Sequence, residues 1–170
     1  KNVQFLYSSK ITCKIETQYK SYVLNVGCNS YRQDIECRLQ AKMASCNFYG
    51  INICNEQQKY DIILNVRHQN HHTYSNQHYN QILADKSKGS FYSKVEIPTL
   101  LHKVEAHQLN KNLLLDDTAQ AFTRPQLDIH SDDVICSHGA TVGNIDQDAI
   151  NYLNSRGVNN SEAKKLITQG

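Results

Sequence analysis

The chain has 170 residues, of which 39% are hydrophobic and 20% are charged, and its formal net charge is +2. This length predicts one domain with enough residues to bury a core. Because the net charge is small and the apolar runs are short, we expect neither nucleic acid nor a membrane among its partners.

Short runs of β-forming residues recur along the chain, and several begin about nine to thirteen residues apart. The expected strands cover residues 3–7, 11–15, 22–26, 35–39, 48–54, 60–66, 91–97 and 127–136. Such spacing predicts a sandwich, a barrel or a solenoid. No Asn-Gly or Asp-Gly dipeptide is present to close a tight hairpin. A parallel β-helix needs no such turn, because each strand stacks on the previous coil.

Six cysteines lie along the chain, without any Cys-x-x-Cys pair. They are Cys13, Cys28, Cys37, Cys46, Cys54 and Cys136. This pattern disfavours a zinc ribbon, a redox motif or a disulfide framework, and it indicates a reducing compartment. The near-regular spacing from 28 to 54 has two interpretations, a sulfur-rich channel or small buried hydrophobes at equivalent positions of a repeating fold. We favour the second interpretation.

The densest histidine run, RHQNHHTYSNQH, carries His68, His71, His72 and His78. Its His-x-x-His-His spacing resembles that of metal ligands, so a histidine-rich metal-binding module is one alternative function. The run lacks an apolar period, however, and a polar turn or loop of the β-helix accounts for it more simply. His68 is retained as a weaker metal candidate.

The stretch 125–143, PQLDIHSDDVICSHGATVG, contains a thiol and an imidazole two positions apart. In a β-strand, residues i and i+2 point to the same face, so Cys136 and His138 should share one side. Thiolate and imidazole are ligands that iron and zinc prefer. One such pair supplies only two ligands, so a metal centre here needs a second surface, most simply a second chain. The alternative is a buried thiol beside a structural histidine.

Three acids, Asp128, Asp132 and Asp133, precede this pair. Carboxylates are adequate iron ligands, which makes Asp132 and Asp133 weaker metal candidates. The alternative is a solvated strand edge that prevents unwanted pairing. The two adjacent acids are also the best candidates for a polysaccharide-acting β-helix enzyme. Adjacent positions of a strand face opposite ways, and this disfavours such an enzyme.

The last part of the chain changes from a strand to a helix period. Asp146 is a good N-cap, and Gly157 closes the first predicted helix. Asn159 then begins a second helix, with Glu162 in the capping-box position. We therefore divide the chain into a β-helix core at 1–143 and the start of a helical domain at 144–170. We expect the whole to be a fragment of a longer protein.

Residues 108–168, centred on PQLDIHSDDVICSHGATVG, closely resemble the C-terminal region of the SufB/SufD family of iron–sulfur cluster assembly scaffolds. Patchier similarity includes YRQDIECRLQAKMASCNFYGI and the spacing of Asp61 from His68. Gly139 separates the two branches of the family. The SufB branch reads His-Glu-Ala-Thr where this chain has His-Gly-Ala-Thr, so the resemblance is to the SufD branch.

The resemblance implies a right-handed parallel β-helix with a short C-terminal helical segment. It implies a scaffold without enzymatic activity, in which His138 is a ligand of the nascent cluster and Cys136 lies at the interface with SufB. It also implies docking of the SufC ATPase on the C-terminal helices. ATP would act only through SufC, because this chain has no phosphate-binding loop.

A transient iron–sulfur cluster or iron is thus expected at the SufB–SufD interface, with no cofactor tightly bound to this chain. A homodimer of the chain is the alternative to the SufB heterodimer. The expected location is a plastid of the apicoplast type, or the cytoplasm if the source is bacterial.

Overall fold

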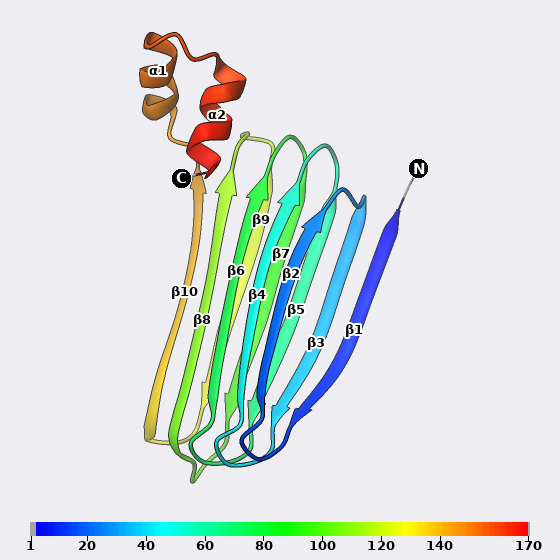
Figure 1. Cartoon of the computed structure of the whole chain (residues 1–170), viewed down its shortest axis with the longest axis vertical. Helices are drawn as coiled ribbons and strands as arrows, with labels where there is room; N and C mark the ends of the chain where they lie inside the picture. The colour runs from blue at the N-terminus through cyan, green and yellow to red at the C-terminus, as the bar shows by residue number, and fades with distance from the viewer. Residues whose placement is uncertain (1–2, 170) are drawn as a thin grey trace.

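The computed structural model describes residues 3–169. In this range ten strands are followed by two short helices (Figure 1). The strands are β1 (Gln4–Cys13), β2 (Gln18–Val26), β3 (Ser30–Leu39), β4 (Ser45–Cys54), β5 (Lys59–His68), β6 (Tyr74–Leu83), β7 (Lys88–Ile97), β8 (His102–Leu114), β9 (Gln120–Ile129) and β10 (Asp133–Asn144). The helices are α1 (Gln147–Ser155) and α2 (Asn160–Gln169).

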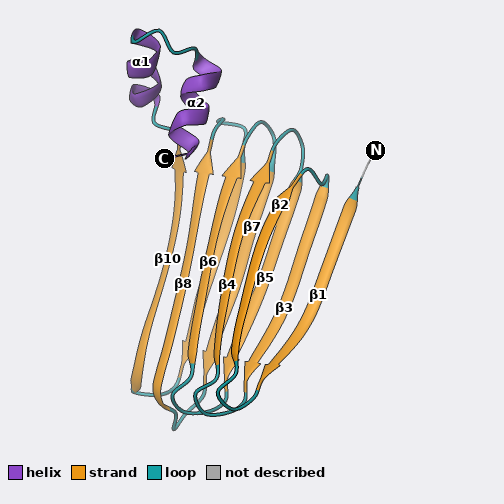
Figure 2. Cartoon of the chain, viewed as in Figure 1, coloured by secondary structure: helices purple, strands orange, loops and turns teal. Residues whose placement is uncertain are grey.

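The strands form two facing parallel sheets. The odd-numbered strands follow the order β1-β3-β5-β7-β9, and the even-numbered strands follow β10-β8-β6-β4-β2. In Figure 2 the two layers largely overlap, one behind the other, and the helices lie beyond one end of the strands. Each coil therefore consists of one odd and one even strand, and successive coils stack. The predicted parallel β-solenoid with a short C-terminal helical segment is confirmed.

The strand register stacks equivalent positions into columns that run from coil to coil. Gln4 pairs with Ser30, and Lys88 pairs with Gln120 at the other end of the same sheet. The inward columns of the odd-numbered sheet are mainly apolar, with Ile35, Leu64, Phe91 and Val95 among the fully buried side chains. Alternate side chains point outward, as the period of two requires.

Many inward positions of β6 and β8 in the even-numbered sheet are polar, and this explains why the sequence pattern did not predict these two strands. In β6 and β8 the inward positions include Ser75, Gln77, Gln81, Gln108 and Asn110, all buried. Without apolar alternation, a hydrophobic-period criterion cannot recognise these strands. Their stability as strands comes from the parallel ladders on both sides.

Two predicted strand boundaries are wrong. The runs 3–7 and 11–15 belong largely to the single strand β1, and Ile15 lies in the following turn with 70% of its surface exposed. The run 127–136 is divided between β9 and β10 by a turn at 130–132. There the Ser131 hydroxyl accepts a hydrogen bond from the Leu101 amide at 3.0 Å and donates one to the Pro98 carbonyl at 2.5 Å. Tertiary contacts to the previous coil thus fix a turn that the local sequence hides.

All six cysteines are free thiols. Cys13, Cys37, Cys46 and Cys54 are buried, which confirms that they serve as small hydrophobes. Burial raises the pKa of Cys13 and that of Cys54 to about 12. The expectation that their spacing follows the structural repeat is wrong, because one coil takes 26 to 32 residues and not nine.

The two helices begin where their capping residues predict. The Asp146 carboxylate accepts hydrogen bonds from the amides of Asp148 and Ala149. Gly157 follows the C-terminus of α1 and has a positive φ of 86°. At α2 the Asn159 side chain accepts from the Glu162 amide at 2.9 Å. Between residues 3 and 169, no helix combines the length and apolar character needed to cross a membrane.

Candidate functional site

Cys136 and His138 lie on β10, the last strand of the even-numbered sheet. Cys136 pairs in register with Ala106 on β8, and His138 pairs with Gln108. Both partners are buried inward-facing residues, so both positions belong to the inner face of the last coil. The two side chains therefore share one face, as the i, i+2 spacing predicts.

The two side chains differ in their exposure to solvent. Cys136 is half-buried and packs against the hydrophobic core, whereas His138 is exposed. Burial raises the pKa of the Cys136 thiol, and the Ala106 backbone opposes this by hydrogen bonding to the sulfur. The thiol is thus protonated at neutral pH, so metal binding here must release its proton.

The last coil leaves an open edge. Within residues 3–169, β10 pairs only with β8 and β9 pairs only with β7. One side of each of these strands carries backbone amides and carbonyls with no neighbouring strand. Pro125, near the middle of β9, fits such an edge because it cannot donate to a ladder. An unpaired edge strand is a template for pairing with another chain.

The acids do not converge on Cys136 and His138. Asp128 faces outward from β9. Its Oδ2 accepts from the Lys94 ammonium at 2.7 Å, and its Oδ1 lies 2.8 Å from Nε2 of His130. Lys94 first, and then His130, holds the pKa of Asp128 below its usual range. Asp132 lies in the turn before β10, and Asp133 begins that strand, accepting from the Lys103 amide at 3.2 Å.

The expectation that Asp132 and Asp133 occupy adjacent positions within one strand is therefore wrong for Asp132. From Asp133 to His138 the strand advances about 16 Å, and the two residues lie on opposite faces. The turn at 130–132 forms because the chain must cross between the sheets at this point.

His68 ends β5 as a fully buried residue of the interior. Its Nδ1 lies 2.7 Å from the Thr73 hydroxyl, and its Nε2 lies 2.9 Å from the Ser75 hydroxyl. Because Thr73 donates its own proton to the Asn70 carbonyl, Nδ1 is the protonated nitrogen and Nε2 accepts from Ser75. Both ring nitrogens are thus occupied by core hydrogen bonds, and burial lowers the pKa of His68 to about 4.

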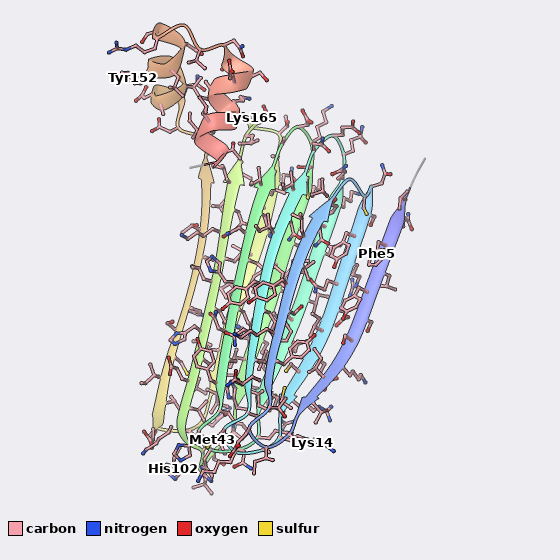
Figure 3. All side chains as sticks on the ribbon, viewed as in Figure 1. Phe5, Lys14, Met43, His102, Tyr152 and Lys165 are labelled. Carbon is pink, nitrogen blue, oxygen red and sulfur yellow. The ribbon has the colours of Figure 1, made fainter. Side chains whose placement is uncertain are left out.

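The other histidines of this run are separated from His68. His71 and His72 lie in the turn before β6, whereas His78 lies within that strand and faces outward. The His71 ring stacks on His102 of the next coil, with 5.3 Å between centroids. Figure 3 shows His102 at the end of the solenoid opposite the helices. Among residues 3–169, no three His, Cys, Asp or Glu side chains gather as a metal site would require.

The sequence pattern did not reveal the buried polar residues on the coils next to His138. Gln108 is 2% exposed and donates from Nε2 to the Ser93 hydroxyl at 2.6 Å, and Ser93 donates onward to Gln77 Oε1. These residues occupy the interior next to the last coil. A search for a repeat of about 30 residues would align positions 77, 108 and 138, because they occupy one column.

These features define a class of protein, a parallel β-solenoid whose last described coil carries a thiol and an imidazole on its inner face and has an unpaired edge. The model of the family described as SUF system FeS cluster assembly, SufBD core domain, matches residues 1–170. The chain belongs to this family.

Individual relatives agree with the family. An iron–sulfur cluster assembly SufBD family protein of Synechocystis is 30% identical over 152 residues, which cover 89% of this chain and 34% of that protein. SufD of Escherichia coli is 42% identical over 93 residues, covering 55% of this chain and 22% of the relative. SufD of Plasmodium falciparum is 23% identical over 167 residues, 98% of this chain and 11% of the relative. The prediction of a SufD-type core is confirmed, and the chain spans about a third or less of these relatives.

Proposed function

We propose that this chain is a scaffold subunit for iron–sulfur cluster assembly, in which Cys136 and His138 hold a nascent cluster or iron at a junction with SufB. The observation that carries the proposal is the placement of both side chains on the inner face of an open edge coil. The cluster is cargo here, and the chain has no resident cofactor of its own in this scheme. Membership of the family supports an iron–sulfur cluster as the cargo. The strand register supports Cys136 and His138 as the position where it is held.

The chemistry of the pair suits a cluster that must be passed on. Iron–sulfur clusters usually bind four thiolates, and imidazole replaces thiolate in some centres. Cys136 and His138 supply two ligands, and the described chain brings no third ligand beside them. The missing ligands would come from the partner. A site divided between two chains releases its cargo when the chains separate.

The open edge of β10 supports the mode of pairing. A strand from SufB, or from a second copy of this chain, can continue the sheet through main-chain hydrogen bonds. This would place the partner next to Cys136 and His138. We propose the SufB heterodimer as the functional pair and treat the homodimer as an outcome of the test.

The helices α1 and α2 are the proposed docking surface of SufC. They project beyond one end of the solenoid, and Tyr152 and Leu166 are 60% and 49% exposed there. ATP would be bound and hydrolysed by SufC, because this chain has no phosphate-binding loop. We propose accordingly that the chain has no enzymatic activity of its own.

The relatives include a chloroplastic protein of Arabidopsis thaliana, ABCI7, and SufD proteins of Plasmodium falciparum and Escherichia coli. They are compatible with a plastid or with the cytoplasm. We propose a plastid of the apicoplast type, and the cytoplasm if the source is bacterial.

The test is cluster loading of the complex formed with SufB and SufC. We expect His138→Ala and Cys136→Ala to lower the iron and sulfide content of the purified complex, because each removes one ligand. Ser137→Ala is the matched control, since Ser137 lies between them and faces outward, 2.7 Å from His107. Unchanged loading in both ligand variants would contradict the proposal.

The partner is tested separately by mass measurement of the mixed proteins. A complex of this chain with SufB is expected. A two-fold homodimer that persists when SufB is present would replace the heterodimer in the proposal.

A further inference from the structure

We propose that Gln108 is a positioning residue for His138, fixing which ring nitrogen carries the proton and which one is presented to the ligand. The proposal rests on the proposed function in one respect, that the free nitrogen of His138 is the one that binds iron. The positioning contact itself depends only on residues of this chain.

A directed hydrogen-bond chain orients the Gln108 amide. Ser93 has one hydroxyl proton, and it donates that proton to Oε1 of Gln77. The Ser93 oxygen is therefore free to accept, and Gln108 donates to it from Nε2 at 2.6 Å. In this series of hydrogen bonds, Oε1 of Gln108 is left without a partner, and it can only accept a hydrogen bond.

The free acceptor lies in the interior, where solvent cannot easily satisfy it. Gln108 is 2% exposed, and its Oε1 has no hydrogen-bond partner among the described residues. A buried carbonyl without a donor destabilises the folded state, because it has lost its hydrogen bonds to water. A nearby N–H group would remove that destabilisation.

His138 is placed to supply the donor. It is the register partner of Gln108 on the adjacent strand, and both positions face inward. Neighbouring strands are about 4.8 Å apart, so rotation of the His138 side chain brings one ring nitrogen within reach of Oε1. Because β10 is the last described strand, no coil beyond it competes for that acceptor. On the other side of Gln108, the buried Nε2 of its register partner Gln77 also lacks a partner and is the competing donor.

This contact would set the chemistry of the imidazole. With one N–H held by Gln108, the neutral ring must carry its lone pair on the other nitrogen, which then points away from the core. Second-shell partners of metal-binding histidines act in this way, and their loss lowers metal affinity about 10–100-fold. Gln108 would present His138 ready to bind at the open edge.

The test is the tautomer of His138 in the metal-free whole chain, measured by long-range proton–nitrogen NMR at a pH where the ring is neutral. His138→Ala identifies the signal among the eight histidines. We expect one dominant tautomer in the wild type and a mixture in Gln108→Leu. Gln108→Glu keeps an acceptor and should restore the single tautomer.

Gln81→Leu is the matched control, because Gln81 is an equally buried glutamine of the same sheet that pairs with Asn112 and not with β10. It should leave the His138 signal unchanged. Ser93→Ala provides a second variant if Gln108→Leu does not fold. It retains Gln108 but frees its amide to rotate, so a mixture is again expected.

A wild-type chain with no tautomer preference would overturn the proposal. So would a folded Gln108→Leu or Ser93→Ala chain whose His138 signal matches the wild type. Because no metal is present in this measurement, it can succeed even if the cluster-loading test fails. In that case only the proposed ligand function of His138 would fall.

Discussion

Lys164 on α2 donates hydrogen bonds to Asp116 in the turn between β8 and β9, with 3.1 Å between Nζ and Oδ1, and to the Leu115 carbonyl at 3.3 Å. This contact joins the helical segment to the end of the solenoid. The Asp85 amide first, and Lys164 second, lowers the pKa of Asp116. A lowered carboxyl pKa means that the contact is present at neutral pH and is lost in acid, as the carboxylate takes up a proton.

We expect Lys164→Met to loosen α2 while leaving the solenoid intact. Both side chains are about one-third exposed, so the free energy of unfolding should fall by at most about 1 kcal/mol. Amide hydrogen exchange is the more sensitive measurement, and it should accelerate in α2 alone. Lys165→Met is the matched control because its side chain is exposed. Equal exchange in both variants would show that the Asp116 contact does not hold the helix.

Gly50 should resist substitution because the Tyr79 ring occupies the space that a Cβ would need. The two residues are register partners on β4 and β6, and Tyr79 is fully buried. Gly50→Ala would force this large ring to move within a packed core, which costs about 1–3 kcal/mol. Urea unfolding measures this loss.

Gly143→Ala is the control for the Gly50 substitution, since a Cβ at Gly143 meets no atom within 4 Å. It should change the free energy of unfolding little. Combining Gly50→Ala with Tyr79→Leu should recover part of the loss by making room for the methyl group. Additive losses in the double variant would contradict the proposed overlap.

His68 should make the folded chain sensitive to mild acid. Its pKa is lowered to about 4 by burial, whereas histidine in the unfolded chain titrates near 6.5. Between these values the unfolded chain binds a proton that the folded chain does not. The free energy of unfolding should therefore fall as the pH falls from 6.5 to 4, by about 3 kcal/mol.

Denaturant unfolding at pH 7 and pH 5 tests this dependence. His68→Gln retains a hydrogen-bonding side chain but cannot titrate, so its stability should change less over that interval. His78→Gln on the outward face of β6 should behave like the wild type. A pH dependence that is the same in His68→Gln as in the wild type would exclude His68 as its source.

The fold and the site were predictable to different extents. Apolar alternation around Ile35, Ile62 and Phe91 marks strands because those side chains fill the interior between the sheets. In β6 and β8 serine, glutamine and asparagine occupy most of the interior positions, and no local pattern separates such a strand from a loop. The turn at 130–132 was hidden for a related reason, since its contacts come from the previous coil.

The sequence alone was enough to place Cys136 and His138 on one strand face, because the period of two is a local property of the backbone. The sequence also indicated where the two helices begin, since Asp146 and Asn159 cap their N-termini through contacts a few residues away. The folded structure was needed to show that this face lies on the last described coil and that Gln108 is the register neighbour of His138. These relationships join residues about 30 positions apart, and stacking of the coils alone brings them together.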